Sequence, residues 1–156
     1  MKYYRILMIN LFLSIILGAC ASETQVMVGK VSQEQLMKDE HFVLSSAENI
    51  LSVEKIQQIK RWPAGLHIDI YFGAWCHDSQ REVPKMLHIL NENKDISTQL
   101  IALDYNKSDP QGLAASMGIK YTPTFIVSLG NKELGRIIER PIQDLVTDIT
   151  EMVAGY

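Results

Sequence analysis

Residues 66–72 alternate between apolar and polar side chains, and this pattern predicts a β-strand. One face would carry Leu66, Ile68, Ile70 and Phe72, and the other His67, Asp69 and Tyr71. Apolar residues at helical spacing follow at once and predict a helix over residues 77–92, with Met86, Leu87 and Leu90 turned inward. Cys76 therefore lies where a strand passes into a helix.

The rest of the pattern predicts an alternation of helices and strands. The expected elements are a short helix capped by Ser32 and Gln35, a helix through Val53, Ile56 and Ile59, a strand over 97–105, a helix from Asp109 to Ala115, a hairpin of 122–129 and 132–139, and a helix over 142–153 with Pro141 in its first turn. Strands joined by a helix run parallel and strands joined by a tight turn run antiparallel. The sequence therefore predicts an α/β fold, with a central mixed sheet flanked by helices on both faces.

The N-terminus has the pattern of an export signal. Lys2 and Arg5 precede an apolar run over 6–17, and the sequence Leu-Gly-Ala-Cys at 17–20 resembles a bacterial lipobox. On this interpretation residues 1–19 are a lipoprotein signal peptide, and Cys20 is lipidated and anchors the chain to a membrane. A plain signal peptide with a cysteine near its end is the alternative.

The lipoprotein interpretation also predicts how the rest of the chain is divided and where in the cell it lies. Residues 20–44 would form a tether and an N-terminal extension, and residues 45–156 the folded domain, in the bacterial cell envelope facing the periplasm or the cell exterior. Ala21 after the cysteine favours the outer membrane if the cell is Gram-negative. Loss of Lys2 and Arg5 with the signal would change the formal charge from −3 to −5. This charge argues against nucleic acid as a partner, and we expect a monomer.

Four features along residues 50–155 resemble the thioredoxin superfamily. Trp75-Cys76 follows a strand and opens a helix, Pro84 follows the cysteine by eight residues, residues 118–124 resemble the loop that carries a cis proline, and a hairpin and a helix close the chain. The resemblance implies a thioredoxin-like fold with Pro123 in the cis form. It also implies that a substrate strand docks on the backbone of Thr122 beside the sulfur, with Trp75 and His77 as further substrate contacts.

The sequence departs from the superfamily at two positions. Ser79 replaces the second cysteine of the usual Cys-x-x-Cys pair, and Ile70 stands where thioredoxins carry a buried acid. Asp69, one position away, would point to the opposite face of the strand. If Cys20 is lipidated, Cys76 is the only thiol and cannot form an internal disulfide.

The residues at the helix N-terminus suggest catalysis by a single thiol. The helix dipole favours the thiolate of Cys76, and the Ser79 hydroxyl is placed to donate to the sulfur. The thiolate can exchange with the disulfide of a protein or a small molecule, but an external thiol must resolve the product. The sequence thus predicts a membrane-anchored monothiol oxidoreductase or isomerase, with Cys76 and Ser79 as catalytic residues.

Two other functions remain open. The domain could bind peptides without catalysis, or Cys76 could react with peroxide. We expect no metal or cofactor, because the histidines and cysteines lack ligand spacing. Arg81 and Glu82 are expected on a solvated helix face, and residues 139–141 are expected to lie near the active site.

Overall fold

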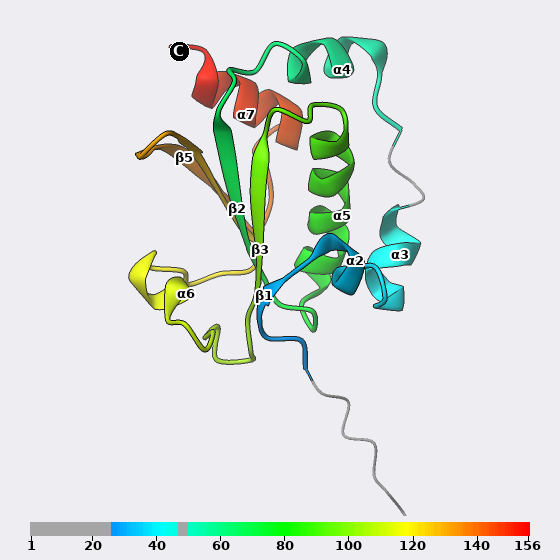
Figure 1. Ribbon diagram of the computed structural model, residues 1–156. Coiled ribbons are helices and arrows are strands. Elements are labelled where there is room, and N and C mark those ends of the chain that lie inside the picture. The colour runs from blue at the N-terminus through cyan, green and yellow to red at the C-terminus, as the bar shows by residue number, and fades with distance from the viewer. Residues whose placement is uncertain (1–25, 47–49) are drawn as a thin grey trace, which may run out of the picture.

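The computed structural model describes residues 26–46 and 50–156 (Figure 1). The described elements, in chain order, are β1 (Gly29–Val31), α2 (Gln33–Leu36), α3 (Glu40–Ser46), α4 (Val53–Ile59), β2 (Leu66–Phe72), α5 (His77–Asn91), β3 (Ser97–Ala102), α6 (Leu113–Ser116), β4 (Thr124–Leu129), β5 (Lys132–Ile138) and α7 (Leu145–Val153). The expected signal peptide and Cys20 lie outside the described residues.

Strand β2 occupies the centre of a five-stranded sheet with the order β1-β3-β2-β4-β5. It pairs in parallel with β3 and antiparallel with β4, so that Ile70 lies between Leu100 and Phe125. Strands β4 and β5 form the predicted antiparallel hairpin. The predicted α/β fold with a mixed sheet is therefore confirmed.

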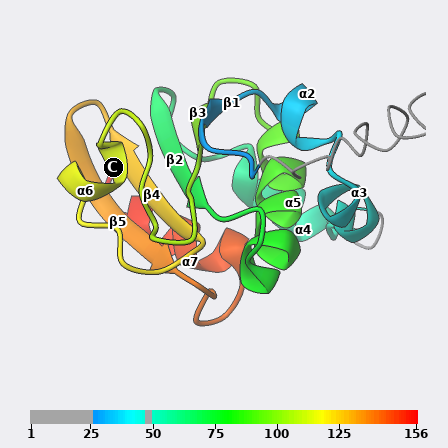
Figure 2. The same ribbon diagram turned by 90° about the horizontal axis from the view of Figure 1, so that it is seen from below.

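The alternating pattern of β2 divides the core between the two faces of the sheet. Leu66, Ile68, Ile70 and Phe72 pack under α2, α3, α4, α5 and α7, which together cover one face (Figures 1 and 2). Tyr71 points to the other face, where it packs with Ile101 and Ile126 beneath α6. Burial raises the pKa of Tyr71 to about 12, with a further increase from Asp69 and Asp109 and an opposing effect of Arg136.

The N-terminal part of the fold differs from the expectation. Residues 29–31 fall within the stretch expected to be a tether, yet they form β1, an antiparallel edge strand on β3. Residues 33–36 form α2, whose predicted capping box of Ser32 and Gln35 is present. Leu36 and Phe42 are completely buried in the main core. This part of the chain is thus integral to the sheet and to its helical layer.

Two helices begin later than the sequence suggests, and in each an aspartate carboxylate accepts from backbone N–H groups of the first turn: Asp144 as the N-cap residue of α7, and Asp109 from a position before Gly112, the N-cap residue of α6. The Asp144 carboxylate accepts from the Thr147 backbone N–H at 3.0 Å, so α7 begins at Leu145 and Pro141 lies before it. The Asp109 carboxylate accepts from the backbone N–H of Leu113 and Ala114, so α6 begins at Leu113. The first N–H groups of a helix have no acceptor within the helix, so an aspartate carboxylate that binds them is favoured at the helix start.

We predict that Asp109→Ala lowers the free energy of unfolding at neutral pH by about 1 kcal/mol, the usual net effect of losing a hydrogen bond to the backbone. Burial opposes ionisation, but the N–H groups of Ala114, Leu113, Gln111 and Gly112 hold the pKa of Asp109 below its usual value. The stabilisation is therefore complete above the unfolded pKa and disappears as pH falls through the folded one. Urea unfolding at neutral and acidic pH, with exposed Asp95→Ala as the control, tests this. An effect of Asp109→Ala that does not change with pH would contradict the assignment.

Candidate functional site

Cys76 lies at the point where β2 delivers the chain to α5. It is the N-cap residue of α5, and its backbone N–H donates to the carbonyl oxygen of Gly73 at 2.9 Å, which closes a turn after the strand. The Cys76 side chain is half-buried and its sulfur forms no disulfide. The thiol therefore lies at the N-terminal end of a fifteen-residue helix, where the peptide dipoles favour negative charge.

The loop before β4 brings a second segment to the sulfur. The Thr122–Pro123 peptide bond is cis, as predicted. The Cys76 Sγ donates to the carbonyl oxygen of Thr122 at 3.1 Å. Two sequence-predicted contact residues, Thr122 and Pro123, are thus brought to Cys76 from a segment far along the chain.

Ser79 has a structural environment that the sequence did not indicate. Its side chain is fully buried, and its Oγ accepts from the Gly73 backbone N–H at 3.2 Å. Among the described residues no hydrogen bond joins Ser79 to Cys76, so the expected donation to the sulfur is not formed. The hydroxyl instead holds the first turn of α5 against the end of β2.

Trp75 lies on the loop that precedes Cys76, and its ring is fixed by a neighbouring loop. Its Nε1 donates to the Leu103 carbonyl oxygen at 3.1 Å, and its ring stacks on Tyr105 with centroids 5.1 Å apart. The Lys107 ammonium lies 5.9 Å from the Trp75 ring centroid. Tyr105 was not expected at the site, because the sequence predicts it as the last residue of a strand over 97–105. In the structure β3 ends at Ala102, and Tyr105 is exposed three residues further along.

Charged side chains surround the first turns of α5. Asp78 lies 2.7 Å from an Arg81 nitrogen and 3.3 Å from an Arg140 nitrogen. The predicted proximity of residues 139–141 to the site is confirmed by this contact. His77 is exposed and has no hydrogen bond or ion pair in the described part of the chain.

The expectation that Glu82 lies on a solvated helix face is wrong. Only 4% of Glu82 is exposed, and its carboxylate pairs with Arg81 at 2.6 Å and with Lys85 at 3.2 Å. The hydrogen bond that Arg81 donates to the Glu82 carboxylate is the main reason that the pKa of Arg81 is raised, while burial acts against it. A buried carboxylate needs such partners, because an uncompensated charge would be strongly destabilising.

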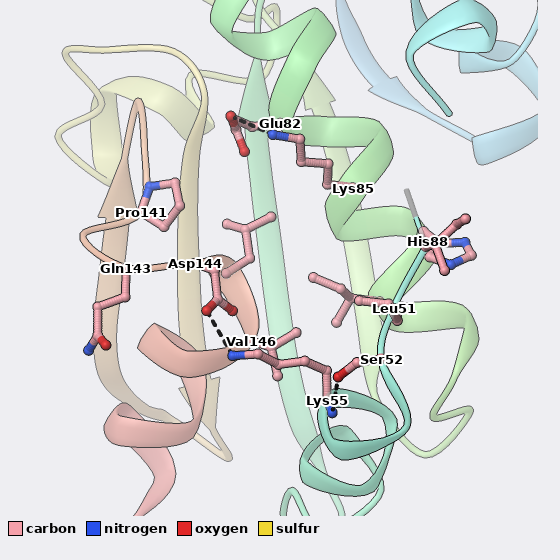
Figure 3. A pocket seen from close by; sticks show the side chains of 13 residues that line it. Leu51, Ser52, Lys55, Glu82, Lys85, His88, Pro141, Gln143, Asp144 and Val146 are labelled. Atoms are coloured by element: carbon pink, nitrogen blue, oxygen red, sulfur yellow. Dashed lines mark hydrogen bonds and ion pairs between the residues drawn. The ribbon is translucent and has the colours of Figure 1, made fainter. Parts of the chain in front are cut away.

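Glu82 also lines a hollow between α4, α5 and α7, with a volume of about 500 Å³ (Figure 3). Lys55, Asp144 and His88 contribute polar groups, and Leu51 and Val146 contribute apolar ones. Lys55 is engaged by Asp144 at 2.7 Å, and Lys85 by Glu82. Cys76 is not among the lining residues, so this hollow is separate from the thiol.

A free thiol at a helix N-terminus beside a cis proline, on a five-stranded mixed sheet, defines a thioredoxin-like domain. A family profile described as "Thioredoxin" matches residues 30–151. The chain belongs to this family. The match begins at β1, in agreement with the place of that strand in the sheet.

Solved structures share the fold at low sequence identity. A protein of unknown function from Pseudomonas aeruginosa has a TM-score of 0.58 at 15% identity, over 80% of this chain and 87% of the other. An HIV epitope scaffold has a TM-score of 0.58 at 14% identity, over 81% and 88%. A domain of an alkylhydroperoxide reductase from Enterococcus faecalis has a TM-score of 0.53 at 15% identity, over 73% and 52%. No curated protein matches this chain.

We predict that Gly73→Ala displaces the Trp75 ring. A Cβ at residue 73 would lie 2.7 Å from Trp75 Cε2, closer than atoms tolerate, so the indole must leave Tyr105 and the Leu103 carbonyl. In a Trp62→Phe background the only tryptophan is Trp75. Its emission should shift to the red and its quenching by acrylamide should rise.

Gly155→Ala is the matched control, because a Cβ at residue 155 meets nothing within 4 Å. Identical spectra for Gly73→Ala and Gly155→Ala would show that the indole is not held where the structure places it.

Proposed function

We propose that this protein performs thiol–disulfide exchange with Cys76 as a single nucleophile. The observation that carries the proposal is the position of its sulfur, at the N-terminus of α5 and 3.1 Å from the Thr122 carbonyl beside cis Pro123. The exposed edge of this arrangement includes Trp75 and Tyr105, which offer a flat apolar surface next to the thiol. A bound client strand would replace the thiol as hydrogen-bonding partner of the Thr122 backbone.

The reaction has two exchange steps. The Cys76 thiolate attacks one sulfur of a client disulfide, a Cys76–client disulfide forms, and the second client sulfur leaves as a thiolate that takes a proton from water. The Ser79 hydroxyl cannot attack this disulfide in turn. A second thiol, from the client or from a small molecule, therefore attacks the client sulfur and regenerates Cys76. Electrons are only exchanged between thiols and disulfides, so no further oxidant is needed.

We further propose that the protein is a lipoprotein of the bacterial envelope, attached through Cys20. Support comes from the order of basic, apolar and small residues before that cysteine. No helix in the described part of the chain is long and apolar enough to cross a membrane. An attached lipid would hold the Cys76 site near the membrane surface, where exported clients pass.

The mixed disulfide with a client should accumulate in cells. Acid-quenched and alkylated cells that express the tagged protein should show heavier bands on a non-reducing gel, and these should disappear with reductant and with Cys76→Ala. Cys76→Ala that still captures the same partners without a covalent bond would instead support a non-catalytic binding module. Loss of the thiol with micromolar peroxide and no client bands would support a peroxide-reactive thiol.

Ser79→Cys should shorten the life of the mixed disulfide. A second thiol one helical turn after Cys76 can attack the client disulfide internally, so the heavier bands should weaken and an internal disulfide should appear. Ser79→Ala is the control, since it also removes the hydrogen bond to Gly73 but supplies no thiol. Equal band intensities in the two variants, with both proteins folded, would contradict the claim that the mixed disulfide persists because residue 79 is not a cysteine.

Cys20→Ala should release the protein from the membrane fraction. The acylated cysteine would be the attachment point, and the rest of the chain would then move to the soluble fraction or retain an uncleaved signal. Metabolic labelling with a clickable fatty acid measures acylation of the protein directly, and Cys76→Ala, which keeps Cys20, serves as the control. Unchanged labelling of Cys20→Ala would contradict the lipid anchor.

A further inference from the structure

The loop between β5 and α7 is held in place at several points next to the thiol. The Glu139 N–H donates to the Pro123 carbonyl oxygen at 2.7 Å, with Glu139 at a φ of 60°. The buried Asp148 carboxylate accepts from the N–H groups of Ile142 and Gln143 at 2.7 and 3.1 Å. Arg140 contacts Asp78 at 3.3 Å. The loop is thus tied to the proline loop, to α5 and to α7.

This well-anchored loop presents an isoleucine to water. Ile142 is 96% exposed, and the neighbouring Ile138 is also exposed. Both line a hollow of about 440 Å³ to which Met152 and Arg140 also contribute. The Asp148 carboxylate accepts from the backbone N–H of Ile142 and so holds the backbone that carries this side chain at the surface. Two exposed branched apolar side chains beside one hollow form a surface that favours a partner.

Arg140 gives the same surface a charge preference. Its side chain is 68% exposed, and it shares the Asp78 carboxylate with Arg81, which is closer at 2.7 Å. One carboxylate cannot satisfy two guanidinium groups, each with five N–H donors. Arg140, which contacts Asp78 in the first turn of α5, therefore keeps donors free for a further carboxylate, whereas Glu151 on α7 is engaged by Gln143 at 2.9 Å.

We propose that this hollow, lined by Ile138, Arg140 and Ile142, selects the clients of Cys76, an inference that rests on the proposed function. The client segment would place an apolar side chain against Ile138 and Ile142 and an acidic side chain against Arg140. The surface is continuous with the site, since Arg140 contacts Asp78, two residues after Cys76. Because Arg140 reaches the first turn of α5, we expect the selected side chains within about four residues of the client cysteine, a span of roughly 13 Å in an extended chain.

The test uses peptides whose single cysteine is joined by a disulfide to 2-mercaptoethanol. The Cys76 thiolate attacks the peptide sulfur, the Cys76–peptide disulfide forms, and 2-mercaptoethanol leaves as a thiolate and is protonated. Three peptides carry Leu-Asp, Leu-Lys or Ser-Asp within about four residues of the cysteine, each placed on either side of it. Intact-protein mass spectrometry of quenched samples gives the rate for each peptide.

The protein should react fastest with the Leu-Asp peptide. Ile142→Ser should slow that reaction about tenfold, the effect of losing one partly buried apolar contact, while Ile50→Ser, also 96% exposed, should not. Arg140→Glu should reverse the order of Leu-Asp and Leu-Lys, with a change of about threefold that salt weakens. Exposed Arg61→Glu is its charge control.

Alkylation by neutral iodoacetamide measures the reactivity of Cys76 alone, and so distinguishes failure of the selecting surface from failure of thiol–disulfide exchange. If Cys76 is alkylated and all peptides react at the same rate, client selection by this surface is contradicted, while thiol–disulfide exchange is not. The same holds if Ile142→Ser alters only self-association. If no peptide forms an adduct although Cys76 alkylates, the exchange function itself fails. Peptide rates that change as stated after each is divided by the alkylation rate of the same variant support the proposal.

Discussion

The site depends on the two-sided pairing of β2 at the centre of the sheet. Its parallel register with β3 and antiparallel register with β4 fix which side chains face the helical layer and where the strand ends. A slip by one residue would turn Ile70 away from the core and displace the Cys76 turn. Strand β4 begins directly after Pro123, so the same pairing brings the Thr122 carbonyl to the sulfur. Sheet register therefore determines the geometry of the thiol.

Ser79 contributes to the structure of the site but supplies no second thiol. Its hydroxyl is buried and accepts a hydrogen bond from the Gly73 N–H, so Ser79 stabilises the junction between β2 and α5. In a Cys-x-x-Cys protein a cysteine stands at this position. The fold thus keeps its active-site shape without the internal thiol. For the proposed exchange the consequence would be kinetic, because the first step would remain open to Cys76 and the second would require an external thiol. If the proposal holds, the surfaces around Trp75 and Arg140 would contribute to the lifetime of the mixed disulfide through their contacts with the client.

Strong local signals made much of the fold predictable from the sequence. The period of two in residues 66–72 predicted β2, and the hairpin followed from two apolar runs around Gly130. The cis form of Pro123 could be expected only through the resemblance of its loop to a known family. Strand β1 was missed, because three residues are too short to show a period and its pairing with β3 is long-range. The burial of Glu82 and the Ser79–Gly73 bond also depend on tertiary contacts, which a local pattern does not contain.

Exchange through a single cysteine is tested most directly by the mass of the purified protein after reaction with a neutral small disulfide such as 2-hydroxyethyl disulfide. One mercaptoethanol adduct should form, located on Cys76 by peptide mapping, and it should persist after removal of the reagent and be lost when free thiol is added. The adduct should be absent from Cys76→Ala. A folded protein whose Cys76 remains unmodified, or an adduct that disappears without added thiol, would contradict exchange through a single cysteine.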